Sequence, residues 1–74
     1  MPSRRLSDVL LTVNGRASEV PDETDLVDLL TSLGLRPGSV VVEHNGTALL
    51  RSELAATPLR EGDRLELVRA VAGG

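Results

Sequence analysis

The sequence predicts a small α+β domain in which one helix packs on a face of a β-sheet. Three observations support this fold class. Two alternating segments are joined by Asn14-Gly15, one stripe of leucines has helical spacing, and three short alternating segments follow that stripe. The order of elements is therefore strand, strand, helix, strand, short strand and strand.

The first two strands are expected to form a hairpin. Residues 8–13 alternate between two faces, which is the period of a strand. Asn14-Gly15 follows and is the strongest two-residue hairpin signal, because a type I′ turn needs a positive φ at both positions. Residues 16–20 are the return strand, which Pro21 ends.

A helix is expected over residues 24–33, where four leucines at i, i+3, i+4 and i+7 form one apolar stripe. The four are Leu26, Leu29, Leu30 and Leu33. Asp25 is the preferred N-cap, with Thr24 as the alternative. Gly34 fits the left-handed position after the helix, and Pro37 prevents its continuation.

The rest of the chain is predicted to complete the sheet. The three further strands span residues 39–44, 48–50 and 64–69. A second Asn-Gly pair, Asn45-Gly46, marks the turn between the first two of these strands. Residues 52–56 are expected to form one helical turn, and His44 is expected to be a solvent-facing residue at a strand end.

A tail follows the last strand. Residues 70–74 carry only small or β-branched side chains and end in Gly73-Gly74. Glycine loses the most backbone freedom on ordering and gains no side-chain contact, so this tail is expected to be flexible. It can extend roughly 16 Å at about 3.3 Å per residue, enough to insert the terminal carboxylate into a narrow channel of a partner. Residues 1–7 are expected to be a loose lead-in to a domain of residues 8–69.

Composition narrows the class of function. The chain of 74 residues has no cysteine and one histidine, which excludes thiol chemistry and a histidine-based metal cluster. It has no aromatic residue and a net charge of −3, whereas nucleic-acid binding favours basic and aromatic groups. It has neither an apolar run of membrane-spanning length nor a signal core, so we expect a cytoplasmic protein.

Several segments together form a more specific pattern over residues 9–74. They are Val13-Asn14-Gly15, Asp28-Leu29-Leu30 with Leu33, Val42-Glu43-His44-Asn45-Gly46, Arg51-Ser52-Glu53-Leu54, Pro58-Leu59-Arg60-Glu61-Gly62-Asp63-Arg64-Leu65-Glu66-Leu67-Val68 and Ala70-Val71-Ala72-Gly73-Gly74. This pattern resembles the ubiquitin-like sulfur carrier family, most closely its ThiS branch. MoaD, the small subunit of molybdopterin synthase, is a near cousin that usually has Phe and Pro-Pro before its Gly-Gly end. The resemblance implies the β-grasp fold, a mixed five-stranded sheet in the order 2-1-5-3-4 with one main helix.

The resemblance also implies a function, that of a sulfur carrier for thiazole formation in thiamine biosynthesis and not an enzyme. A ThiF-like adenylating enzyme would use MgATP to activate Gly74, and a thiocarboxylate would form there with sulfur supplied indirectly by a cysteine desulfurase. ThiG thiazole synthase would then take the sulfur. Gly73 and Ala72 would let the tail enter its partners, and the chain itself would bind no cofactor or metal.

Strand parity suggests a docking surface for these partners. Leu10, Val41 and Val68 point away from the helix, on strands that the resemblance makes neighbours. An exposed apolar patch marks an interface, although isolated exposed aliphatic residues are ordinary. We therefore expect these three residues to contact a partner. Three other functions stay open from the sequence: a carrier for molybdopterin synthesis, a protein modifier attached to lysines, and an interaction domain whose terminus has no role.

Overall fold

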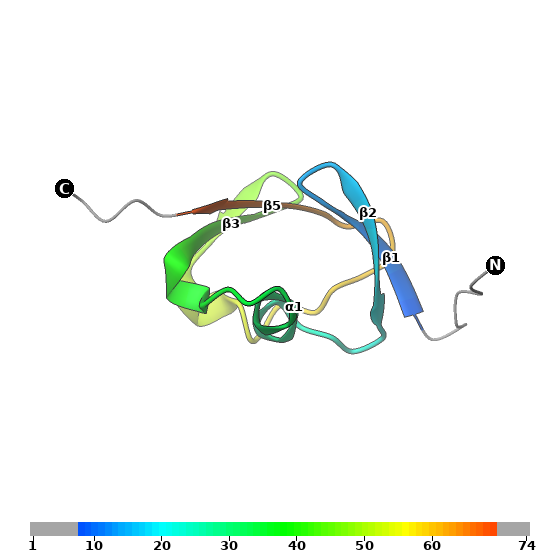
Figure 1. Ribbon diagram of the computed structural model, residues 1–74, viewed down its shortest axis with the longest axis horizontal. Coiled ribbons are helices and arrows are strands. Elements are labelled where there is room, and N and C mark those ends of the chain that lie inside the picture. The colour runs from blue at the N-terminus through cyan, green and yellow to red at the C-terminus, as the bar shows by residue number, and fades with distance from the viewer. Residues whose placement is uncertain (1–7, 70–74) are drawn as a thin grey trace.

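A five-stranded sheet in the order β2-β1-β5-β3-β4 forms the frame of the molecule in the computed structural model, which describes residues 8–69 (Figure 1). The strands are β1 (Asp8–Val13), β2 (Arg16–Pro21), β3 (Val40–His44), β4 (Thr47–Leu49) and β5 (Arg64–Arg69). The helices are α1 (Leu26–Ser32) and the short 3₁₀ turns η1 (Pro37–Ser39) and η2 (Arg51–Glu53). Strand β5 pairs parallel with β1 and antiparallel with β3, so the sheet is mixed. The predicted fold class and strand order are confirmed.

Both predicted hairpin turns are present. Asn14 and Gly15 have φ angles of 50° and 82°, and Asn45 and Gly46 have angles of 52° and 87°. These positive values at consecutive residues are those of type I′ turns, whose twist matches that of the flanking strands. The two turns therefore fix the registers of the β1–β2 and β3–β4 hairpins.

Helix α1 is shorter than predicted. Asp25 caps its start as expected, because its Oδ1 accepts a hydrogen bond from the amide of Asp28 at 2.8 Å. At the other end Leu33 is the C-cap rather than a core residue, and half of its surface is exposed. Gly34, with a φ of 75°, and Leu35 then donate backbone hydrogen bonds to the last turn of the helix. The prediction that Leu33 is the last residue of the helix and of its apolar stripe is wrong, because α1 ends at Ser32.

Four other elements have bounds that differ by one to three residues from those predicted. Strand β3 begins at Val40 because Pro37–Ser39 forms a 3₁₀ turn, and Pro21 is part of β2, an edge strand where its missing N–H is tolerated. Strand β4 covers Thr47–Leu49, and the helical turn is η2 at Arg51–Glu53. Leu50, predicted to be in β4, lies between these two elements and is 68% exposed.

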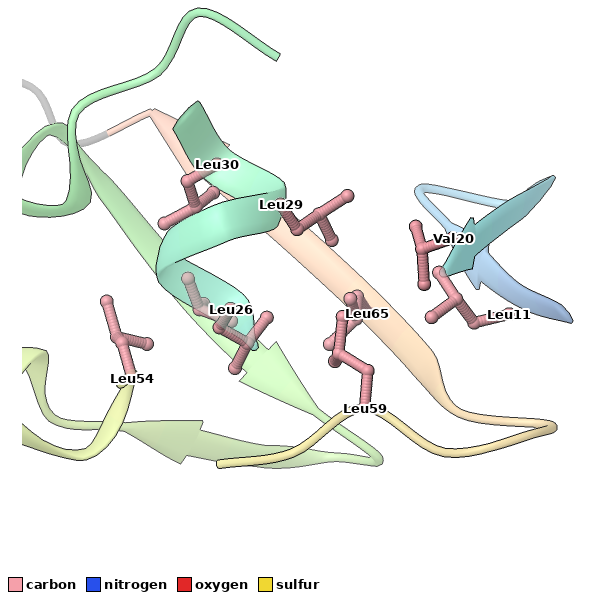
Figure 2. Packing of buried hydrophobic residues seen from close by; sticks show 9 residues of the cluster. Leu11, Val20, Leu26, Leu29, Leu30, Leu54, Leu59 and Leu65 are labelled. Carbon is pink, nitrogen blue, oxygen red and sulfur yellow. The ribbon is translucent and has the colours of Figure 1, made fainter. Parts of the chain in front are cut away.

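The core lies between α1 and the sheet. Its buried members are Leu11, Val20, Leu26, Leu29, Leu30, Val42, Leu54, Leu59 and Leu65. Figure 2 shows Leu26, Leu29 and Leu30 of α1 in one cluster with Leu65 of β5, and Leu54 and Leu59 come from the segment between β4 and β5. Val9, Val40 and Leu67 pack against this cluster, which confirms the parity predicted for their strands.

Candidate functional site at the end of strand β5

Strand β5 is the element that leads into the C-terminal tail. It lies between β1 and β3 in the middle of the sheet, and Arg69 is its last residue (Figure 1). The predicted residues of sulfur attachment and tail entry, Gly74, Gly73 and Ala72, lie outside the residues that the structure describes. The structure therefore shows how the base of the tail is held.

Asn14 pairs with β5 beyond the end of β1. The last backbone pair between the two strands is Val13 with Leu65, and the Asn14 amide donates to the Leu65 carbonyl at 2.9 Å. The side chain of Asn14 then continues the pairing: its Oδ1 accepts from the Leu67 amide at 2.8 Å, and its Nδ2 donates to the Leu67 carbonyl at 3.4 Å. A side-chain amide thus takes the place of a strand residue and extends the hold on β5 toward the tail.

Removing this side chain is expected to loosen the end of β5. Asn14→Gly keeps the positive φ of the turn, since glycine adopts it freely, and deletes both hydrogen bonds to Leu67. We expect the free energy of unfolding to fall by about 1–2 kcal/mol and hydrogen exchange at the Leu67 amide to accelerate. Chemical denaturation and exchange measured by NMR test this. Asn14→Asp, which keeps the acceptor for that amide, serves as the comparison, and equal exchange in wild type and both variants would show that Asn14 does not hold the strand.

The other end of β5 is anchored by Asp63. Asp63 is buried, 7% exposed, and its carboxylate accepts hydrogen bonds from Asn45 Nδ2 at 3.0 Å and from the Arg60 amide at 2.9 Å. Its Oδ2 also lies 2.8 Å from His44 Nε2. His44 is the last residue of β3, as predicted, but its side chain contacts Asp63 and is only partly exposed, so the prediction that it faces solvent is wrong. The contact is invisible in the sequence because the two residues are 19 positions apart.

The electrostatics of Asp63 give a testable dependence of stability on pH. Burial alone would raise its pKa, but the hydrogen bonds from His44, Asn45 and the Arg60 amide lower the pKa below the ordinary value of 3.8. Because the pKa is depressed in the folded state, the stabilisation is present at a pH above 3.8 and is lost as the pH falls through the folded pKa.

Asp63→Asn is therefore expected to reduce the free energy of unfolding at neutral pH by about 1–3 kcal/mol, because an NH₂ group replaces an acceptor among donors. The difference from wild type should shrink as the pH falls below 3.8. Urea denaturation of both proteins across this range tests the prediction. If the difference in free energy of unfolding between the two proteins stays constant with pH, the conclusion that Asp63 stabilises the fold as an ionised carboxylate is wrong.

The predicted docking residues all lie exposed on the sheet face away from α1. Leu10 is 37%, Val41 46% and Val68 57% exposed. Val41 and Val68 are direct cross-strand partners and form one apolar pair. Leu10 is level with Gly62, whose amide donates to the Leu10 carbonyl, and this places it about 20 Å along the sheet from Val68 at the usual rise per residue. The structure therefore brings together two of the three residues, and their docking role stays a prediction.

The outer face also carries acidic groups that sequence reasoning missed. Glu43 and Glu66 are cross-strand partners next to the Val41–Val68 pair and on the same face. Like charges in this arrangement repel each other. A basic group of a partner placed beside the two glutamates would reduce this repulsion. These glutamates line a hollow of about 250 Å³ together with Thr12, Gly15, Gly46, Arg64 and Leu65. The pairing of Glu43 with Glu66 can be recognised only from the register of β3 and β5.

Residues 8–69 contain neither a cluster of metal ligands nor a membrane-spanning helix. No group of three or more His, Cys, Asp or Glu side chains in this part of the chain is arranged to hold a metal ion. No helix here is long and apolar enough to cross a membrane.

The mixed sheet in the order 2-1-5-3-4, crossed by one helix, and the terminal strand held from both sides define a ubiquitin-like protein of the β-grasp class. The ThiS family model matches residues 8–74. This chain belongs to the ThiS family. Members of this family are small sulfur carriers in thiamine biosynthesis and are not enzymes.

Two solved structures are similar to this chain along most of its length. The crystal structure of the thiamine biosynthesis protein ThiS from Geobacter metallireducens is 35% identical, covers 89% of this chain and 100% of its own, and superposes with a TM-score of 0.77. The solution structure of a thiamine biosynthesis protein from the same organism is 35% identical, with coverages of 89% and 88% and a TM-score of 0.70. A comparison with curated proteins gives no match.

Proposed function

We propose that this chain carries sulfur as a thiocarboxylate on Gly74 and donates it for thiazole formation in thiamine biosynthesis. The observation that carries the proposal is the family match, which runs through the terminal Gly73-Gly74. The structure supports it with a rigid base for the tail, since β5 is hydrogen-bonded on both sides and Asn14 extends that hold to Leu67.

The chemistry needs an activating partner because a carboxylate is a poor electrophile. A ThiF-like enzyme joins the Gly74 carboxylate to the α-phosphate of MgATP and releases pyrophosphate. A persulfide sulfur, supplied through a cysteine desulfurase, displaces AMP, and a thiol reduces the resulting acyl disulfide to the thiocarboxylate. ThiG then accepts the sulfur. Because these steps use ATP, we place them in the cytoplasm.

This chain acts as the substrate and scaffold in these steps. Its tail contains no side chain that could serve as an acid, a base or a nucleophile. The Val41–Val68 pair is the apolar surface we propose for docking, and the neighbouring Glu43–Glu66 pair would meet basic groups of ThiF or ThiG. Partner recognition is thus assigned to the sheet, and the chemistry to the terminal glycine.

The experiment that tests this function is release of pyrophosphate by the ThiF-like enzyme with MgATP and this chain. We expect release that saturates with the concentration of the chain, followed by thiazole formation once ThiG, its small-molecule substrates and a sulfur source are added. The matched control lacks Gly73-Gly74 and should give neither reaction. Pyrophosphate release that is equal with the truncated chain would refute the proposal.

A further inference from the structure

A groove of about 430 Å³ lies on the helix side of the sheet, where β5 ends. It is lined by Val13, Asn14, Arg16, Leu33, Leu35, Val40, Leu67 and Arg69. Five of these side chains are apolar, two are arginines and none is a carboxylate. The groove is therefore an apolar and locally basic surface on a chain whose net charge is −3.

The groove exists because α1 is too short to cover the whole sheet. The helix ends at Ser32, and its buried leucines pack in the core with Leu11, Val42 and Leu65. The next apolar residues of the same three strands, Val13, Val40 and Leu67, are left only partly buried. The chain after the helix forms the other wall, with Leu33 half exposed there.

Strand pairing places both arginines on the same face of the sheet. Arg16 is the cross-strand partner of Val13, and Arg69 is the partner of Val40. Cross-strand partners share a face, so both arginine side chains rise beside the apolar side chains of the groove. A guanidinium group binds a carboxylate through paired hydrogen bonds, which makes an acidic segment the fitting occupant.

We propose that this groove receives a segment of the adenylating enzyme in which an apolar side chain is flanked by carboxylates. The inference rests on the proposed function, because Arg69 both lines the groove and directly precedes the tail that this enzyme takes up. An enzyme that binds the tail is therefore already next to the groove and can contact it in the same complex. The apolar side chain covers Leu33 and Leu67, and the carboxylates meet Arg16 and Arg69.

The test uses the full-length chain with Arg16→Glu and, separately, Leu33→Ser. The matched controls are Arg60→Glu and Leu50→Ser, which change an exposed arginine and an exposed leucine outside the groove. We measure kcat and KM for pyrophosphate release, and the Kd for the enzyme without ATP by calorimetry. Both groove variants are expected to raise KM and Kd about tenfold with kcat unchanged, and both controls to stay close to wild type. Thermal unfolding confirms that all four variants are folded.

The possible outcomes distinguish a failure of this inference from a failure of the proposed function on which it rests. A wild-type chain that the enzyme does not adenylate refutes the proposed function and the inference with it. A wild-type chain that is adenylated, with groove variants whose KM and Kd equal those of the controls, refutes the groove alone. Sedimentation showing wild-type self-association that Arg16→Glu abolishes would assign the groove to a second copy of the chain and also overturn the inference.

Discussion

Gly73→Leu is expected to lower the rate of adenylation at Gly74 about a hundredfold or more, while the midpoint of thermal unfolding stays that of wild type. The tail must place its carboxylate against the α-phosphate of ATP, and a side chain at the penultimate position displaces the reacting atoms. Misplacement by about 1 Å is enough for a loss of this size. We expect no change in stability, because glycine has no side chain to contribute to a core and residue 73 comes four positions after β5 ends at Arg69.

A graded pair of variants makes this prediction sharper. Gly73→Ala adds only a Cβ and should give an intermediate rate, whereas Ala70→Leu enlarges a side chain at the base of the tail and should have a smaller effect. The measurement is the rate of pyrophosphate release at saturating MgATP. If Gly73→Leu is adenylated as fast as wild type, the idea of a narrow channel around the end of the tail is wrong.

Val41→Asp is expected to weaken binding to the ThiF-like enzyme and to ThiG by about thirtyfold. Val41 is 46% exposed and pairs with Val68, so a partner that covers this pair would bury an unpaired carboxylate beside Glu43 and Glu66. The folded state should lose little stability, since the new charge stays in contact with water in the free protein. Calorimetric titration with each enzyme measures the effect.

Leu10→Asp is the matched comparison for this variant. Leu10 is exposed to a similar degree on the same face, but it lies about 20 Å along the sheet from Val68. A loss confined to Val41→Asp would locate docking at the Val41–Val68 pair. Equal losses in both variants would mean that partners cover the whole outer face, and unchanged binding in both would refute docking on this face.

The elements that local sequence determines were predicted well. The two Asn-Gly turns follow from the positive φ that these residues adopt, and the bounds of β1 and β5 follow from the alternation of Val9, Leu11 and Val13 and of Leu65 and Leu67. The predicted range of β4 begins and ends one residue too late, because the apolar run Ala48-Leu49-Leu50 has no alternation that would mark the bounds of the strand. Leu33 was misplaced because helical spacing continues past the point where Gly34 turns the chain.

The features that depend on pairing between distant strands could not be predicted from one sequence. The contacts of Asn14 with Leu67 join residues 53 positions apart, and those of Asp63 with Asn45 span 18 positions. The separation of Leu10 from Val68 and the opposition of Glu43 and Glu66 follow from the sheet register. Composition and alternation identify the face on which a residue lies, but they do not tell which residue lies beside it.

Intact mass spectrometry tests most directly whether this scaffold presents a chain end that can be loaded with sulfur. The full-length chain is incubated with the ThiF-like enzyme, MgATP and a sulfur source, and a ThiS protein that the same enzyme loads serves as the positive control. We predict an ATP-dependent replacement of one oxygen by sulfur, located by fragmentation at the carboxyl group of Gly74. An unchanged mass beside a loaded control, or sulfur attached elsewhere in the chain, would contradict the proposed role.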